Sequence, residues 1–117
     1  CRIIDKYVEY FPIDGICVHD DWGSQRAPFF SLDTVKEMLV PHIRKVTEHA
    51  HSKGLFYDMH CCGQVENLIP AMIEAGVDSW SGQPMNDKGT LPPVWQRNPD
   101  RRGYAGYPGG YAGRDSV

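Results

Sequence analysis

The sequence of 117 residues lacks a long apolar run, a strong net charge and an internal repeat. No apolar stretch approaches the roughly 20 residues that a membrane-spanning helix needs. The net charge of −3 gives no electrostatic reason to expect nucleic acid or an anionic membrane as a partner. A secretory signal is also absent, although the chain begins with Cys1 rather than methionine, which weakens that inference.

The sequence also lacks cysteines spaced as in a secreted disulfide scaffold. Its four cysteines are Cys1, Cys17, Cys61 and Cys62. The neighbours Cys61 and Cys62 are poorly placed to form a disulfide with each other, because adjacent residues rarely meet its geometry. The pattern therefore predicts a reducing, cytoplasmic setting with free or metal-bound thiols.

What the sequence does contain is a regular alternation of helical and extended patterns. Apolar spacing predicts helices over residues 2–10 and 32–53 and between Gly63 and Gly76. Strands are predicted over residues 15–21, 55–61 and 77–83. Within the long helical stretch, Pro41 predicts a kink or two consecutive helices, and Ser31 is a suitable N-cap.

This order predicts an α/β fold with about three parallel strands and connecting helices. Two architectures are compatible with it: an open, doubly wound sheet, or a segment of an eight-stranded (β/α)8 TIM barrel. A complete barrel usually takes about 250 residues. Three strands cannot close one, so the barrel interpretation makes this chain a fragment.

The carboxyl-terminal part of the sequence has a different character. From Lys88 onward the chain is rich in Pro, Gly, Tyr and Arg and has no apolar periodicity. We predict an α/β unit over residues 1–91 and a tail over residues 92–117 that is disordered or an artefact. Its tyrosines and arginines would also suit stacking on single-stranded RNA, but an unstructured tail is the preferred interpretation.

The segment "DMHCCGQ", residues 58–64, is a candidate metal-binding motif. On an extended strand His60 and Cys62 share a face, while Cys61 points the opposite way. Zinc accepts nitrogen and sulfur ligands, and parallel α/β folds gather functional residues at the carboxyl ends of strands. A catalytic zinc generally has three protein ligands, however. The alternative is a hydrogen-bonded histidine beside two packing thiols.

The segment "HDDW", residues 19–22, ends the first predicted strand. Alternation places Asp21 on the same side as His19 and opposite Asp20, so Asp21 is a candidate substrate contact or a residue that orients a ligand. The alternative is helix capping and loop hydrogen bonding. Arg26 can bind a carboxylate or phosphate, or simply be solvated. The histidines at positions 42, 49 and 51 are predicted to be structural.

Two longer blocks contain these motifs: "DGICVHDDWGSQRAPFFSLDTVKEMLVPHI" and "HSKGLFYDMHCCGQVENLIPAMIEAGVDSWSGQP". Together they resemble the uroporphyrinogen decarboxylase superfamily, specifically its branch of corrinoid-dependent methyltransferases, from about Tyr10 to Leu91. The resemblance implies an α/β barrel. It also implies a zinc ion held by His60, Cys62 and a later cysteine, which would lie outside this chain because no cysteine follows Cys62.

For the full-length parent, the resemblance implies zinc-dependent methyl transfer from a methylated corrinoid, carried by a partner protein, to a small thiol acceptor. An alternative within the superfamily is metal-free decarboxylation of the acetate side chains of a tetrapyrrole, a lyase reaction of porphyrin biosynthesis. A third expectation is that the isolated chain is a non-catalytic truncated fragment, and that the tail after Leu91 is a gene-end artefact. Partial sheets with open edges are prone to aggregate.

Overall fold

The computed structural model describes residues 1–81, and predictions for residues 82–117, including the tail, lie outside the described residues. The elements in chain order are α1 (Arg2–Tyr10), β1 (Gly15–His19), α2 (Leu32–Met38), α3 (Val40–Ser52), β2 (Phe56–His60), the short 3₁₀ helix η1 (Glu66–Leu68), α4 (Ile69–Glu74) and β3 (Ser79–Ser81). The predicted alternation of helices and strands is confirmed.

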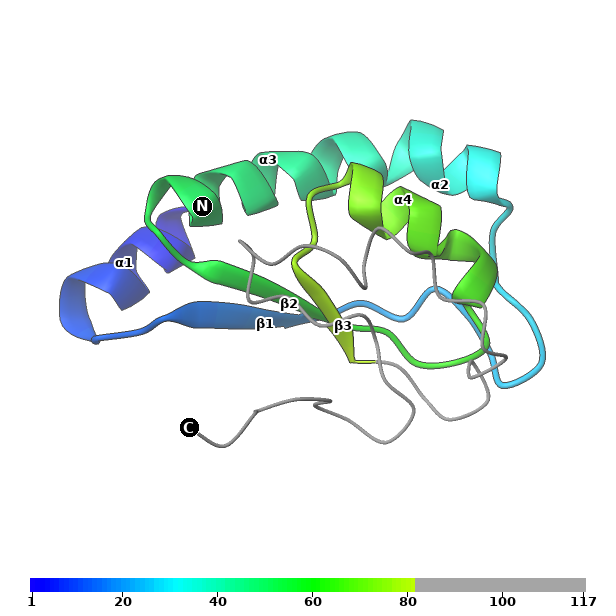
Figure 1. Cartoon of the computed structure of the whole chain (residues 1–117), viewed down its shortest axis with the longest axis horizontal. Helices are drawn as coiled ribbons and strands as arrows, with labels where there is room; N and C mark the ends of the chain where they lie inside the picture. Colours follow the sequence, from blue (N-terminus) through cyan, green and yellow to red (C-terminus); the bar gives the residue numbers. More distant parts are fainter. Residues whose placement is uncertain (82–117) are drawn as a thin grey trace.

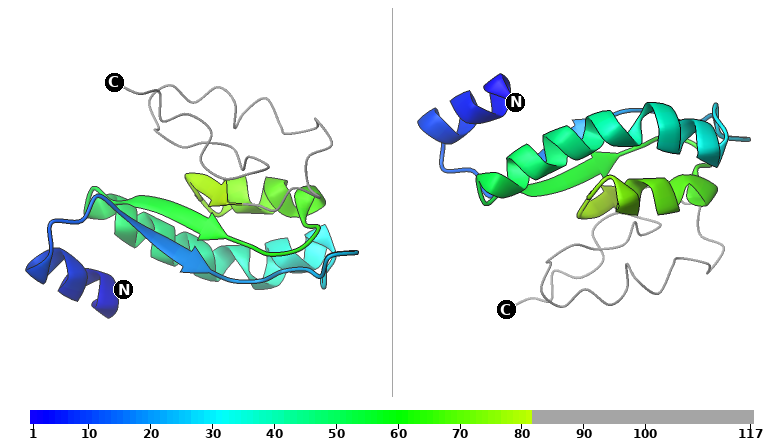
Figure 2. Two further views of the ribbon diagram at one scale, coloured as in Figure 1. Left: turned by 90° about the horizontal axis from the view of Figure 1, so that it is seen from below. Right: turned by 90° about the horizontal axis from the view of Figure 1, so that it is seen from above.

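The three strands form an open parallel sheet in the order β1-β2-β3. The register pairs Cys17 with Asp58 and Asp58 with Ser79. Figures 1 and 2 show α2, α3 and α4 together on one face of this sheet. The predicted parallel α/β fold is therefore confirmed, with its helices α2–α4 in a single layer.

The helical stretch predicted over residues 32–53 is divided into two helices next to Pro41, as expected from that proline. Helix α2 ends at Met38, and Pro41 lies in the first turn of α3, where its missing N–H has no intrahelical partner to lose. The Ser31 hydroxyl accepts a hydrogen bond from the Thr34 N–H at 3.2 Å and caps α2. The sequence prediction of two consecutive helices is confirmed.

The helix predicted between Gly63 and Gly76 begins differently from a regular α-helix. It starts with the 3₁₀ turn η1, and the α-helical part α4 follows with Pro70 in its first turn. Proline has no N–H to donate back along the chain, so the turn before it need not be α-helical. Of the apolar side chains whose spacing predicts this helix, Val65, Leu68, Ile69 and Met72 are fully buried and Ile73 is partly buried.

The two faces of the sheet differ in chemistry. Side chains such as Val18, Met59 and Trp80 join the apolar core beneath the helices. Cys17, Asp58 and Ser79 occupy the alternate positions and form a row across all three strands on the opposite face. The buried Asp58 carboxylate accepts a hydrogen bond from the Cys17 thiol at 3.1 Å and another from the Ser79 hydroxyl.

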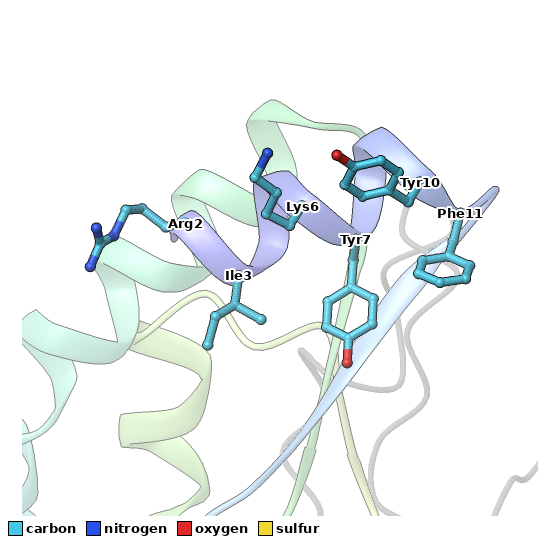
Figure 3. Close-up of a pocket in the computed structure, with 6 residues that line it drawn as sticks. All are labelled: Arg2, Ile3, Lys6, Tyr7, Tyr10 and Phe11. Atoms are coloured by element: carbon cyan, nitrogen blue, oxygen red, sulfur yellow. The ribbon is translucent and has the colours of Figure 1, made fainter.

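Helix α1 lies beyond the β1 edge of the sheet (Figure 2). Ile4 is buried, and the Asp5 carboxylate contacts His49 at 2.7 Å and Lys53 at 3.7 Å. Exposed aromatic and aliphatic side chains of α1 line a shallow pocket, and Figure 3 shows Ile3 and Tyr7 extending to the same side of the helix. Among the described residues, no helix has the length and apolar character needed to cross a bilayer.

Candidate metal centre

The candidate site lies where β1 and β2 end side by side. His19 and His60 are the last residues of these strands and are direct partners in the parallel register. Their rings lie 4.6 Å apart, centroid to centroid, at an interplanar angle of 34°. The backbone N–H of Asp20 then donates to the His60 carbonyl at 3.1 Å, which extends the pairing beyond β1. Both loops that follow therefore begin from the same edge.

The imidazole of His60 and the thiol of Cys62 lie on the same side of the chain. The distance from His60 Nε2 to Cys62 Sγ is 3.1 Å. Cys61 points the other way, is fully buried, and accepts a hydrogen bond from the Trp22 N–H at 3.2 Å. The alternation inferred from the motif thus continues through Cys62, two residues past the end of β2.

Asp21 reaches the same place from the loop after β1. The backbone N–H of Cys62 donates to Asp21 Oδ1 at 2.9 Å. Asp21, His60 and Cys62 each offer one potential ligand atom, and these three atoms lie within 4.8 Å of one another. In residues 1–81 the structure therefore brings a carboxylate, an imidazole and a thiol together in a single cluster, which we call the DHC cluster.

Close contact between the two loops determines the shape of the cluster. Gly63 adopts φ +88°, and a Cβ atom there would lie 2.5 Å from the carbonyl carbon and oxygen of Gly23. The Gln64 N–H donates to the Ser24 carbonyl at 2.8 Å. Glycine is needed at Gly63 both for its backbone conformation and for the space it leaves.

Other residues considered from the sequence lie elsewhere. The Asp20 carboxylate accepts a hydrogen bond from Trp22 Nε1 at 3.0 Å and is not part of the DHC cluster. Arg26 lies in the turn from Ser24 to Ala27, where its N–H donates to the Ser24 hydroxyl at 3.3 Å.

The histidines of α3 make structural contacts. His49 Nε2 lies 2.7 Å from an oxygen of Asp5, and His51 Nε2 lies 2.6 Å from an oxygen of Asp78. His42 is exposed near the start of the same helix. The contacts of His49 and His51 agree with the structural role predicted for them.

Charges in the DHC cluster influence one another. The hydrogen bond from the Cys62 N–H lowers the pKa of Asp21, and the nearby imidazoles of His60 and His19 act in the same direction. Loss of solvent raises the pKa of the Cys62 thiol, and the neighbouring Asp21 carboxylate raises it further. Without a cation, the cluster therefore holds an ionised carboxylate beside a protonated thiol.

The other two thiols in the sheet region are less reactive still. Burial raises the pKa of Cys61 to about 12. Partial burial and the hydrogen bond to Asp58 raise the pKa of Cys17 to about 11. Because the thiolate is the reactive form, neither group is a good nucleophile or ligand at neutral pH.

The donor set of the DHC cluster fits a borderline metal ion such as zinc. Zinc binds histidine nitrogen, cysteine sulfur and carboxylate oxygen. Ideal tetrahedral bonds would place the nitrogen and sulfur about 3.5 Å apart, and the 3.1 Å between His60 and Cys62 needs only a small adjustment.

Two features of this region were missed by sequence reasoning. The tilted contact between the rings of His19 and His60 follows from the strand register, which could not be read from the sequence. The row formed by Cys17, Asp58 and Ser79 could have been anticipated from the sequence in part, because each of these residues alternates with apolar positions on its own strand. Recognising it required knowing which residues of the three strands pair.

Comparisons with protein-family models, with curated proteins and with solved structures each found no match to this chain.

Proposed function

We propose that the described unit is a segment of a closed (β/α)8 barrel of the uroporphyrinogen decarboxylase superfamily. Two structural features support this proposal. The strands follow one another across the sheet in sequence order, and α2–α4 cover one face. A doubly wound sheet places helices on both faces, whereas a barrel keeps them outside and leaves the other face inward.

For the parent protein we propose zinc-dependent methyl transfer from a methylated corrinoid to a small thiol acceptor. The observation that carries this proposal is the 3.1 Å contact between His60 Nε2 and Cys62 Sγ at the carboxyl end of β2. In parallel α/β proteins this edge is where catalytic residues gather. The corrinoid would be presented by a partner protein.

His60 and Cys62 would hold the metal, the first through its imidazole nitrogen and the second through its sulfur. Bound zinc supplies Lewis acidity, which lowers the pKa of a thiol substrate so that it reacts as a thiolate. In the overall transfer the thiol would release its proton to solvent, the sulfur would form a bond to the methyl carbon, and the cobalt–carbon electron pair would stay with cobalt. Cys61 contributes by packing, because its side chain is buried on the opposite side.

The zinc content of the purified full-length parent tests this proposal. We expect about one equivalent of zinc, lost in Cys62→Ala and retained in Cys17→Ala. Cys17 is a suitable control because it lies on the same face of the sheet and its thiol hydrogen-bonds to Asp58. A metal-free parent that decarboxylates a tetrapyrrole would overturn methyl transfer in favour of the alternative reaction.

A further inference from the structure

We propose that Asp21 is itself a metal ligand, so that this chain alone supplies three donors: an oxygen, a nitrogen and a sulfur. The inference rests on the proposed metal site and deepens it. The family resemblance assigns the third ligand to a later cysteine, whereas the structure places a carboxylate of this chain at the same cluster. The chain would therefore bind a divalent cation without any contribution from a downstream strand.

The position of the Asp21 carboxylate supports a ligand role. One of its oxygens lies within 4.8 Å of both the His60 nitrogen and the Cys62 sulfur. The Cys62 N–H donates to Oδ1, and this hydrogen bond orients the carboxylate toward the cluster. Asp21 is exposed, which allows an ion from solution to reach it.

Of the two alternative roles considered for Asp21, helix capping does not apply, whereas hydrogen bonding between loops is observed. The next helix, α2, begins at Leu32 and is capped by Ser31, ten positions beyond Asp21. The hydrogen bond that Asp21 accepts comes instead from the loop after β2. Its side chain thus faces the neighbouring loop that carries Cys62.

The site is also held in shape by contacts that do not involve the metal. The Trp22 N–H donates to Cys61, and the Gln64 N–H donates to Ser24, so residues on either side of the ligands connect the two loops. Gly63 packs against Gly23 at the same point. Because folding has already brought the donors together, a metal ion needs to order little of the chain when it binds.

Charge and chemistry favour a borderline divalent ion. A carboxylate and a thiolate would together balance its two positive charges, and the imidazole would complete three protein ligands. Three protein ligands with an open position are the usual arrangement of catalytic zinc. That open position is what a thiol acceptor would need, which connects this inference to the proposed reaction.

Binding of Co²⁺ and Zn²⁺ to the 117-residue chain tests the assignment. Absorption spectra with Co²⁺ report the ligands, because thiolate coordination gives a charge-transfer band and the d–d bands respond to the remaining donors. Zinc affinity is then measured by competition with Co²⁺. The variants are Asp21→Asn, Asp20→Asn and Cys62→Ala. Asp20→Asn is the matched control, since it removes the same charge from the adjacent residue.

We expect Asp21→Asn to change the d–d bands and to keep the charge-transfer band. It should also weaken zinc binding by roughly 100-fold or more, a larger loss than the removal of an outer-sphere contact usually causes. Asp20→Asn should bind like the unmodified chain. Unchanged d–d bands in Asp21→Asn at saturating Co²⁺ would overturn Asp21 as a ligand, whatever the affinity, and leave His60 and Cys62 intact. A charge-transfer band that persists in Cys62→Ala would instead contradict the proposed metal site. The variant Asp21→Glu, which retains a carboxylate, should recover part of the affinity.

Discussion

At the scale of single residues, the candidate site depends on two glycines in contact. Gly63 has φ +88° and faces the backbone of Gly23, with Ser24 O also 2.6 Å from the place of a Cβ. A side chain here would have to adopt a disfavoured backbone conformation and also push the two loops apart. The distance between Asp21 and Cys62 would change with it, because those residues lie on the same two loops.

We therefore predict that Gly63→Ala destabilises the protein more than Gly54→Ala. Gly54 also has a positive φ, +73°, but a Cβ there would meet no atom within 4 Å. The backbone cost is about 1 kcal/mol at either position, and at Gly63 the clash adds to it. Urea unfolding monitored by circular dichroism gives both values. Equal losses for the two variants would show that the loops separate freely.

A second residue-level prediction concerns thiol reactivity. At pH 8, iodoacetamide should modify exposed Cys1 first and Cys17 at least ~10-fold more slowly, because the pKa of Cys17 is raised to about 11. Cys61 is fully buried and should react only after unfolding. Peptide mass spectrometry over time measures each rate, and the same reaction in urea is the control. Modification of Cys17 as fast as Cys1 would contradict its bond to Asp58.

At the scale of elements, helix α1 is attached to α3 partly through charge. The hydrogen bond from His49 lowers the pKa of Asp5, and the nearby Lys53 adds to the effect. A carboxyl group with a lowered folded-state pKa stabilises the protein above its unfolded value, near 3.9, and loses that contribution as the pH falls through the folded value. The attachment of α1 should therefore weaken in acid.

We predict that Asp5→Asn lowers stability at pH 6 and that the difference from the unmodified protein shrinks as the pH falls below about 4. Chemical unfolding at several pH values provides the measurement. Glu48→Gln is the matched control, since Glu48 is an exposed carboxylate of α3, the helix that carries His49. A deficit in Asp5→Asn that stays constant down to pH 2.5 would exclude the charge contribution.

The order of the elements and the positions of α1–α3 were the parts of the structure that the sequence predicted best, whereas β1 and β3 are shorter than predicted. The spacing over residues 2–10 gave α1 with its observed ends, and Pro41 gave the division between α2 and α3. These features are local, because helix periodicity and proline act within a few residues. The sequence did not predict that the Asp21 carboxylate lies within 4.8 Å of the ligand atoms of His60 and Cys62. That position depends on the Cys62 N–H and on the Gly23–Gly63 contact, which join segments about 40 residues apart.

At the scale of the whole molecule, the described fold separates a packed apolar layer from a polar sheet face. The core lies between the sheet and α2–α4, while Cys17, Asp58 and Ser79 line the other face below the DHC cluster. Parallel sheets are usually buried on both faces. In the proposed barrel this face would turn inward, and the hydrogen bonds of Asp58 with Cys17 and Ser79 would satisfy its polar groups there.

A metal ion bound at the DHC cluster would connect the ends of β1 and β2 and so stabilise the whole unit. A ligand that binds the folded state alone, at a free concentration 100 times its dissociation constant, adds about 2.7 kcal/mol to the free energy of unfolding. We predict a zinc-dependent rise approaching this size in the unmodified chain and its loss in His60→Ala. Thermal unfolding with and without zinc gives the measurement. His42→Ala is the control, because His42 is exposed on α3 and lies outside the cluster. If zinc stabilised both variants equally, its binding would not involve the edge where β1 and β2 end.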